Sequence, residues 1–557
     1  MPNPDYRKMF EDLDPYYPQP KDLNELATFM SKQARFPDAA RILESLNVLV
    51  QDQPEPIPIP AGYTYLAQFI IHDISFDERS DRHIREDLPW NVIDTERIRE
   101  LRNLRKPNFD LETVYGYEEP TNRGEPRRSE LMRENSPLPF LKLGNTEKEL
   151  GTGTPALSYP CDLPRKDGSV EANIVDPRND ENLLLAQTLV AFIKFHNAIV
   201  VKLIESGEYK DEAGNYKKEE LFEKARKLTI RYYQTIVLTD FLPRVVQRSV
   251  VEEVMLPKNT KKLFYQPDLF IPLEFSVAAF RFGHSMIRQK YNLNVSHFDK
   301  SPPLEMDTSA NLFHIMMFTG KGRMGANEAL LNLPSIWIIN WNLFYEIDGS
   351  PVNYAEPINI DLALGLLRLR PKTDSSINRD GRASALAALD LYRGRRFGLP
   401  TGQDVAKKIG EKPLDAARIV DLIMSKEIKG VSANEAEEIK ERLCAAFAEK
   451  TPLWFYILAE AELQKDGKLG SVGSRIVAET IIQLLYHSEY SILRQDWEDG
   501  EDFLLKNSDE FFANPEIKTF GMPEMLKFIQ EMNEKYSEKL YPTMQHKFDE
   551  INPLGKG

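Results

Sequence analysis

A long apolar run with helical spacing dominates the middle of this sequence. "DENLLLAQTLVAFIKFHNAIVVKLIES", which begins at Asp180, repeats apolar residues three and four positions apart, as in a helix that is buried on most sides. The same spacing recurs in residues 218–246, 272–291, 384–396, 436–450 and 474–495. Strand signals are few and short, and no repeat of fixed period is present. We therefore predict a mainly α protein with a single large helical domain and long loops.

The order of these patterns suggests three parts. Residues 1–60 form an extended arm with one short helix, because "QDQPEPIPIPAG" near its end imposes extended geometry at each proline. Residues 61–500 carry the helical core, interrupted by an irregular stretch at 105–175 that is rich in Gly, Pro and charge. Residues 501–557 are amphipathic and are expected to form a C-terminal helical extension packed on that domain.

Composition excludes some function classes. The chain of 557 residues has a formal net charge of −15 and no basic block, which argues against a nucleic-acid partner. No run of about 18 apolar residues predicts a transmembrane helix. The N-terminus lacks the basic start and apolar stretch of a secretory signal, so the expectation is cytoplasmic, although a mature form without its leader stays open. Two cysteines give no disulfide framework, and nothing indicates the oligomeric state.

An unusual set of polar side chains lies in "AGYTYLAQFIIHDISFDERSD", read as a helix over residues 62–80. Gln68 and His72 fall on one face of that helix, one turn apart, and Asp73 points about a quarter-turn away. One interpretation is a structural core histidine beside a surface carboxylate. The other is a catalytic His and Gln facing a cavity, with Asp73 binding something on another side.

Two more segments place charged residues at helix starts or within apolar helices. In "DPRNDENLLLAQ", Arg178 precedes a helix that Asn179 or Asp180 could cap, and Glu181 would stand in its first turn. In "EFSVAAFRFGHSMIRQKY", His284 follows Gly283 within an apolar helix, with Arg281 three residues earlier. A surface arginine and a core histidine would explain both segments structurally. A glycine beside a histidine would equally leave room for a large flat group.

"LAALDLYRGRRFGLP" places Asp390 inside an apolar run, with Arg393 one turn later. A buried carboxylate needs a partner, which could be Arg393 or a histidine from another segment.

Taken together these segments resemble the landmark blocks of the peroxidase–cyclooxygenase superfamily, the animal-type haem peroxidases, in a bacterial-like form. The resemblance covers residues 57–405 in the family order and extends to about residue 485. It includes "PIPAGYTYLAQFIIHDISFD", "NFDLETVYG", "DPRNDENLLLAQTLVAFIKFHN", "EFSVAAFRFGHSMI", "NLPSIWIINWNLFYEI" and "LDLYRGRRFGLP".

The resemblance implies a role for each matching residue. His72 and Gln68 match the distal histidine and glutamine, Arg178 matches the distal arginine, and His284 matches the proximal ligand of haem iron. Arg281 would then meet a haem propionate, while Arg393 would lie close to the haem. The implied cofactor is haem b, and the implied reaction reduces hydrogen peroxide or an organic hydroperoxide through a ferryl intermediate that oxidises a small reductant or lipid.

The chain departs from the family pattern at the haem contacts. Asp390 stands where Asn commonly bonds the proximal histidine, and it should make His284 more imidazolate-like. Ile71 replaces one carboxylate that esterifies haem in mammalian members, and Asn182 excludes a sulfonium link. Glu181 matches the other ester position, so at most one ester is expected.

Two other departures from the family pattern concern calcium binding and the radical tyrosine of the cyclooxygenases. Relatives bind calcium near the distal histidine, and Asp73, Asp110 and Glu112 would supply oxygen ligands here. Lys106 falls where a Thr ligand is usual, and an ammonium could instead replace the ion by pairing with Asp73. Arg281 occupies the place of the radical tyrosine of the cyclooxygenases.

The leading hypothesis is therefore a haem peroxidase, with three alternatives. A fatty-acid dioxygenase is disfavoured by Arg281, although another of the 22 tyrosines could serve. A metal phosphohydrolase built on His72 and Asp73 would need further ligands, which His83, His196 and His314 do not obviously supply. A haem-free helical scaffold is the third alternative. The reductant, whether halide, phenol or lipid, is not identified by the sequence.

Overall fold

The computed structural model is described here for most of the chain. The described residues are 5–31, 59–77, 92–93, 95–117, 125–146, 158–255, 269–295, 309–317, 319, 332–363, 366, 386–428, 431–498, 500–507, 518–542 and 548–553.

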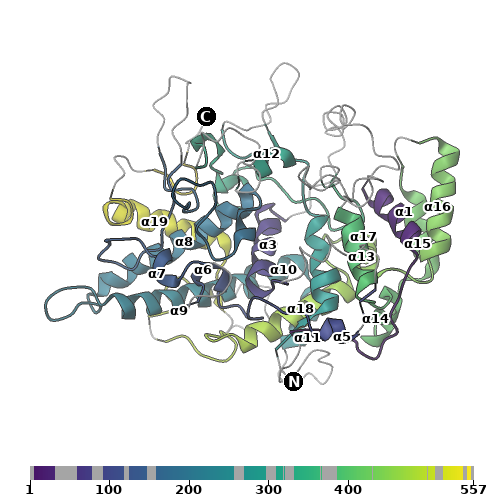
Figure 1. Ribbon diagram of the computed structural model, residues 1–557, viewed down its shortest axis with the longest axis horizontal. Helices are drawn as coiled ribbons and strands as arrows, with labels where there is room; N and C mark the ends of the chain where they lie inside the picture. The colour runs from purple at the N-terminus through teal and green to yellow at the C-terminus, as the bar shows by residue number, and fades with distance from the viewer. Residues whose placement is uncertain are drawn as a thin grey trace, which may run out of the picture.

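The molecule is built around α8 (Leu183–Leu203), the apolar run noted in the sequence. This helix packs against α3 (Gly62–Ile74), α9 (Lys218–Ile236) and α19 (Met522–Leu540), and Figure 1 shows it among them. Leu183–Ser206 is long and apolar enough to cross a membrane, but its apolar stretch of 18 residues is fully buried inside the fold, as in the central helix of a packed core. The predicted mainly α fold is confirmed.

The other helical segments complete this core and cover its sides. They are α1 (Pro20–Met30), α5 (Thr95–Arg99), α6 (Glu112–Tyr115), α7 (Arg128–Leu131), η1 (Pro177–Asp180), η2 (Ile204–Ser206), η3 (Val237–Phe241), α10 (Leu242–Val245), α11 (Arg248–Met255), η4 (Glu274–Ala278), η5 (Ala279–His284), α12 (Leu312–Met317), η7 (Ser335–Trp337), η8 (Trp341–Leu343), α13 (Leu386–Arg396), α14 (Gly402–Lys408), α15 (Ala416–Ser425), α16 (Ala433–Phe447), α17 (Leu453–Gln464) and α18 (Ser471–His487).

Strand structure in the described residues is limited to three pairs of two-residue strands. The first pair is parallel and the other two are antiparallel. They join β1 (Tyr6–Arg7) to β2 (Ile271–Pro272), β3 (Lys290–Tyr291) to β4 (Ala310–Asn311), and β5 (Lys506–Asn507) to β6 (Lys518–Thr519).

The N-terminal residues 5–31 lie against the helix that carries Asp390. Lys8 Nζ donates to Gly398 O at 2.7 Å, and Arg395 Nε donates to Pro18 O at 2.8 Å. Helix α1 packs on α13 and α16. The arm is thereby tied to α13 and to the residues just after it, while the proposed domain boundaries stay a prediction.

Helix α3 is shorter than the predicted 62–80. It ends at Ile74, where Ser75 turns to an extended conformation with φ −145° and ψ 134°. The Asn103 side chain explains this end, because its Nδ2 donates to Ile74 O at 2.9 Å and its Oδ1 accepts from Phe76 N at 2.7 Å. A side-chain amide from another segment thus satisfies the end of the helix.

The start of α8 also differs from the prediction. Asn182 is its cap, since its Oδ1 accepts from Leu185 N at 2.9 Å, and neither Asn179 nor Asp180 has this role. Those two residues belong to the short 3₁₀ helix η1. Glu181 consequently precedes α8 and does not stand in its first turn.

The segment around His284 is a distorted helix, not the regular one predicted. Glu274–Ala278 has π-helical hydrogen bonds, Ala278 breaks the regular geometry at φ −125° and ψ −72°, and Ala279–His284 continues as a 3₁₀ helix. Residues three apart eclipse each other in a 3₁₀ helix, so Arg281 and His284 share one side. Such local distortions often occur at functional sites.

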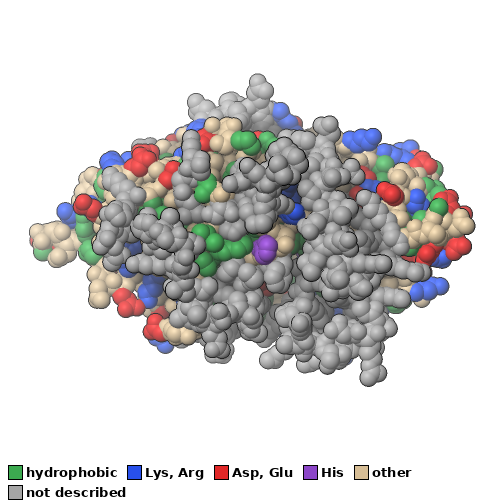
Figure 2. Space-filling model, turned by 90° about the horizontal axis from the view of Figure 1, so that it is seen from above, with side chains coloured by type: hydrophobic (Ala, Val, Ile, Leu, Met, Phe, Trp, Pro, Cys, Tyr) green, Lys and Arg blue, Asp and Glu red, His purple; other side chains and the backbone are tan. Residues whose placement is uncertain are grey.

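On the face of the molecule shown in Figure 2, the charged side chains of the described residues lie mainly toward the two ends. Lys and Arg are mixed there with Asp and Glu over the described residues. This mixture is consistent with the absence of a basic block from the sequence.

Candidate active site

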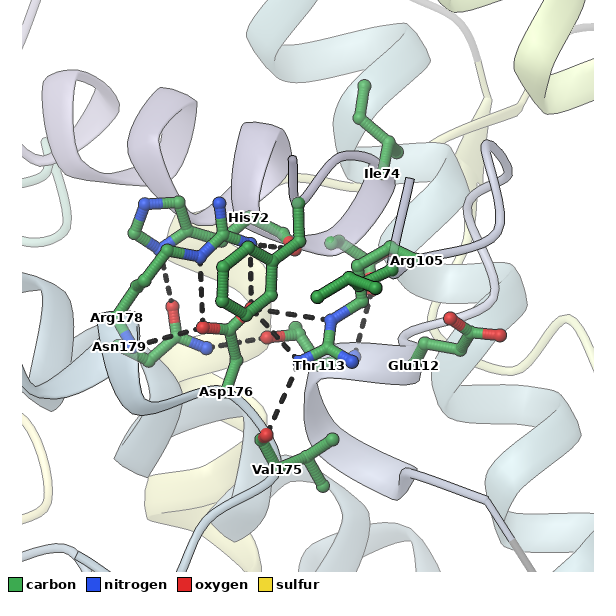
Figure 3. Close-up of polar contacts among 12 residues, drawn as sticks. His72, Ile74, Arg105, Glu112, Thr113, Val175, Asp176, Arg178 and Asn179 are labelled. Carbon is green, nitrogen blue, oxygen red and sulfur yellow. Dashed lines mark hydrogen bonds and ion pairs between the residues drawn. The ribbon is translucent and has the colours of Figure 1, made fainter. Parts of the chain in front are cut away.

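His72 lies on α3 with one ring nitrogen fixed and the other free. Its Nδ1 donates to Asn179 Oδ1 at 2.9 Å, and Asn179 Nδ2 in turn donates to Thr113 Oγ1 at 2.6 Å (Figure 3). Because an amide oxygen can only accept, Nδ1 carries the proton and Nε2 is left as the basic nitrogen. Among the described residues Nε2 has no hydrogen-bond partner.

The surroundings of His72 keep this imidazole neutral. Burial and the nearby Arg178 guanidinium lower the pKa of His72 to about 3, although Asp176 and Asn179 act in the opposite direction. A neutral imidazole with a free Nε2 can accept a proton at any ordinary pH.

Arg178 is held rigidly beside His72. Its Nε donates to Asp176 Oδ1 at 3.0 Å and its Nη2 donates to Asp176 Oδ2 at 2.7 Å, a bidentate pair. The same Nη2 donates to His72 O at 3.0 Å, and Phe76 stacks with its ring centre 4.0 Å from the guanidinium carbon. Nη1 has no hydrogen bond to the described residues, so this nitrogen can donate to a ligand.

Asp176 is the centre of this arrangement and was not identified from the sequence. Its fully buried carboxylate also lies 3.1 Å from Arg105 Nη2, and Arg105 Nη1 pairs with Glu125 at 3.0 Å. Burial alone would raise the pKa of Asp176, but Arg178 and Arg105 outweigh it and hold that pKa well below its usual value. The signal that could have revealed Asp176 was its place two residues before Arg178, where it also accepts from Arg178 N.

Gln68 lies one turn before His72, as predicted. Its Oε1 accepts from Asn182 Nδ2 at 3.0 Å. Asn182 therefore caps α8 and fixes Gln68 at the same time, a second role that sequence reasoning missed.

His284 and Asp390 form the second half of the predicted site. His284 Nδ1 donates to Asp390 Oδ2 at 2.5 Å, and the His284 side chain stays 23% exposed while Asp390 is fully buried on α13. Arg393 Nη1 donates to the other carboxylate oxygen, Oδ1, at 3.2 Å. Both partners considered for Asp390 are therefore present. Burial alone would raise its pKa, but His284, Arg281 and Arg393 together lower it.

Arg281 is a half-buried cation without an ion-pair partner among the described residues. Its Nε donates to Ser276 O at 2.9 Å. Burial, Arg393 and Arg178 lower the pKa of Arg281 to about 10, and Asp390 only partly offsets this. A half-buried guanidinium that lacks an acidic partner among the described residues fits an anionic group brought by a ligand.

There is also open space beside His284. A Cβ added at Gly283 would meet no atom within 4 Å, so this glycine does not mark a tight helix crossing. His284 Nε2 faces no hydrogen-bond partner among the described residues. A free imidazole nitrogen, room for a flat group and an unpaired arginine fit an iron porphyrin with its propionates.

The predicted calcium ligands are already engaged by other donors. Asp73 accepts from Leu111 N at 3.3 Å and Thr113 N at 3.2 Å, Asp110 accepts from Glu489 N at 3.0 Å, and Glu112 Oε2 accepts from Tyr117 OH at 2.6 Å. Burial raises the pKa of Asp73 well above its usual value and that of Asp110 to about 6, and neighbouring carboxylates add to both shifts. No cluster of three His, Cys, Asp or Glu side chains in the described part of the chain could hold a metal ion.

Lys106 does not pair with Asp73, the contact that was considered as an alternative to a calcium ion. Its Nζ lies 3.9 Å from Glu112 Oε1, and the side chain is 69% exposed, whereas Asp73 is fully buried. The lysine therefore reaches toward solvent instead of pairing with Asp73.

The phosphohydrolase alternative lacks a metal cluster in the described residues. His196, one of its candidate ligands, is buried between Tyr115 OH at 3.0 Å and Pro139 O at 3.1 Å. Both of its ring nitrogens are already used, so His196 is structural. His314 lies on α12, and His83 falls outside the described residues.

Comparison with known proteins identifies the family of this chain. The family model for the animal haem peroxidase matches residues 29–325, more than half of the chain and a range that includes His72, Arg178 and His284. The chain belongs to the animal haem peroxidase family. This confirms the family predicted from the sequence, and it leaves Asp390 beyond the matched range.

Individual relatives match over shorter lengths. A chorion peroxidase of Aedes aegypti is 28% identical over 159 residues, which are 26% of this chain and 19% of the relative. A peroxidase-like protein of Margaritifera margaritifera is 30% identical over 34% of this chain and 22% of the relative. Mouse eosinophil peroxidase is 23% identical over 43% of this chain and 30% of the relative. Each match thus spans less than a third of the relative.

Solved structures share the fold over nearly the whole chain. Peroxidase A of Dictyostelium discoideum has a TM-score of 0.52 at 15% identity, covering 97% of this chain and 92% of that one. A fatty acid alpha-dioxygenase of Arabidopsis thaliana has a TM-score of 0.51 at 14% identity, covering 98% of this chain and 80% of that one. At this identity the likeness establishes the fold and not the activity.

Proposed function

We propose that this protein is a haem peroxidase that reduces hydrogen peroxide, or an organic hydroperoxide, and oxidises a small reductant. The observation that carries the proposal is the pairing of His72 and Arg178, each fixed by its neighbours and each left with one free nitrogen. Haem b held by His284 would supply the iron and the porphyrin that give two electrons to the peroxide and so store its two oxidising equivalents for the reductant.

The side chains would divide the proton and charge transfer between them. His72 Nε2 accepts a proton from one peroxide oxygen and returns it to the oxygen that leaves as water. Arg178 Nη1 stabilises the negative charge that develops on the leaving oxygen. Gln68, on the same helix face, would orient the peroxide. Asp390 and Arg281 would hold the His284 side chain and the haem propionate, respectively.

The direct test of this function is a haem titration followed by reaction with peroxide. The purified protein should bind about one haem per chain with a Soret band, and it should consume hydrogen peroxide in proportion to an added phenol or halide. A protein that binds no haem would instead be the haem-free scaffold. Oxygen uptake with linoleate and no added peroxide would favour the dioxygenase.

The rate of the peroxide reaction should be nearly independent of pH between about pH 5 and 8. The active base is neutral His72, and its pKa of about 3 means that protonation removes the base only in stronger acid. Stopped-flow absorbance at each pH measures this rate. A fall in rate centred near pH 6.5 would show an ordinary, solvated histidine and contradict the account.

An Asp390→Asn protein should have a higher Fe(III)/Fe(II) potential than the wild type. The carboxylate accepts the His284 Nδ1 proton at 2.5 Å and so favours the more oxidised iron, whereas an amide bonds more weakly. Redox titration of the Soret band gives the potential. An unchanged or lower potential would refute the effect, and haem content serves as the control for folding.

At most one covalent haem link is expected, an ester through Glu181. Ile71 cannot form an ester, and Glu181 lies between η1 and α8, beside the residues that hold Arg178. Acid–acetone extraction after peroxide treatment should leave part of the haem on the wild type and none on a Glu181→Gln protein. Complete extraction from the wild type would argue against the link.

Calcium binding through Asp73, Asp110 and Glu112 stays a prediction from the family resemblance. Metal analysis of the purified protein before and after chelation would decide it.

A further inference from the structure

Tyr63 donates its phenol proton to a buried carboxylate. This tyrosine lies at the start of α3 with 1% exposure, and its OH is 2.8 Å from Asp240 Oδ1 and 2.7 Å from Oδ2. Burial and the Asp240 carboxylate raise the pKa of Tyr63 well above its usual value, so the phenol stays protonated. The proton is held where a base can take it.

Asp240 is kept available as that base. Arg244 Nε donates to its Oδ1 at 2.9 Å, and Met522 N donates to its Oδ2 at 2.9 Å. The Arg244 guanidinium also lies over the Tyr63 ring, 4.3 Å from its centre. These contacts remain when a proton from Tyr63 arrives, since a carboxyl group still accepts at its other lone pairs.

We propose that Tyr63 is a redox-active tyrosine and that Asp240 is its proton acceptor. The inference rests on the proposed peroxidase function, because the oxidant is haem that hydrogen peroxide has oxidised. Tyr63 loses one electron to that haem and its phenol proton to Asp240. The products are a neutral tyrosyl radical, a protonated Asp240 and a haem reduced by one electron, so charge and atoms balance.

The position of Tyr63 suits this step. It precedes His72 by nine residues on the same helix, which is about 13 Å along the axis. Its ring meets the ring of Tyr345 edge-on with centres 5.1 Å apart, and Tyr345 lies 5.8 Å from Trp341, which is 8% exposed. Contiguous oxidisable rings therefore extend from the helix of His72 through Tyr345 to Trp341.

Tyr65 provides a matched comparison on the same helix. It is also buried, but its OH donates to the hydroxyl of Tyr291 at 2.9 Å, which already accepts from Arg288 N at 3.0 Å. A phenol oxygen that receives two donors is a poor proton acceptor. Tyr65 lacks the carboxylate that makes the loss of an electron from Tyr63 favourable.

The test is electron paramagnetic resonance of haem-loaded protein frozen after one equivalent of hydrogen peroxide, with no reductant added. The wild type and Tyr65→Phe should give a tyrosyl radical signal that narrows when tyrosine is ring-deuterated. Tyr63→Phe should lose most of this signal, several-fold or more, while keeping its Soret band and its rate of reaction with peroxide.

The outcomes separate the two proposals. Equal radical yields in Tyr63→Phe and Tyr65→Phe, with normal reaction of the haem, would overturn the role of Tyr63 and leave the peroxidase function standing. A wild type that binds no haem, or whose haem does not react with peroxide, would overturn both. An Asp240→Asn protein with wild-type radical yield would overturn the role of Asp240 as proton acceptor.

Discussion

An Asp176→Ala protein is expected to lose about 3–5 kcal/mol of its free energy of unfolding, because removing one partner of a buried ion pair leaves an uncompensated charge. Asp176 and Arg105 are both fully buried at their side chains, and Arg178 is bound by the same carboxylate. Glu125 would still pair with Arg105, but Arg178 would keep only its bond to His72 O and its contact with Phe76. Denaturant unfolding of the haem-free protein measures the loss.

Asp415→Ala is the matched control for this loss. Asp415 pairs with Lys412 at 3.4 Å, but both side chains are exposed, so its removal should cost no more than about 1 kcal/mol. Equal losses of unfolding free energy in the two alanine variants would show that the buried network around Arg178 does not stabilise the fold as expected.

A His72→Ala protein that keeps its haem is expected to react with hydrogen peroxide about 10²–10⁴ times more slowly than the wild type, the usual effect of a general acid–base group. Nε2 of His72 is the free basic nitrogen beside the Arg178 guanidinium, and the described residues offer no second base there. Stopped-flow measurement of the Soret change gives the rate.

The matched control is His196→Gln, which replaces a buried histidine bonded to Tyr115 and Pro139 O. This change should affect stability but leave the peroxide rate within a few-fold of the wild type. A His72→Ala rate close to that of the control would remove His72 from the mechanism.

The helical core could be predicted because its signal is local. The apolar spacing of α8 alone indicates a buried helix, and α3 and α9 follow the same pattern. The errors lie where distant residues decide the local structure. Asn103 ends α3 early, and Asn179 bonds His72 instead of capping α8. The bonding partners of Ile74 O and His72 lie in other segments, so residue spacing within a single segment does not predict them.

The distorted segment at His284 shows a second limit. Apolar spacing cannot distinguish a regular helix from consecutive π and 3₁₀ turns, because each puts residues three to five apart on one side. The 3₁₀ geometry nevertheless still puts Arg281 and His284, which are three residues apart, on one side of the segment.

The candidate site residues and the residues that hold them differ in how far the sequence indicates them. Motif resemblance points to His72, Arg178 and His284 as candidates, and isolation in an apolar run points to Asp390. Asp176, Arg105 and Asn179 escaped notice because their importance lies in contacts across long sequence separations, 71 residues between Arg105 and Asp176 and 107 between His72 and Asn179.

The most direct test of the account is a crystal structure of the protein loaded with haem. We expect the iron bound to His284 Nε2, with His72 Nε2 and Arg178 Nη1 facing the other side of the porphyrin and Arg281 at a propionate. Iron bound by another residue, or a haem that leaves His72 and His284 on the same side or out of reach, would contradict the proposed site.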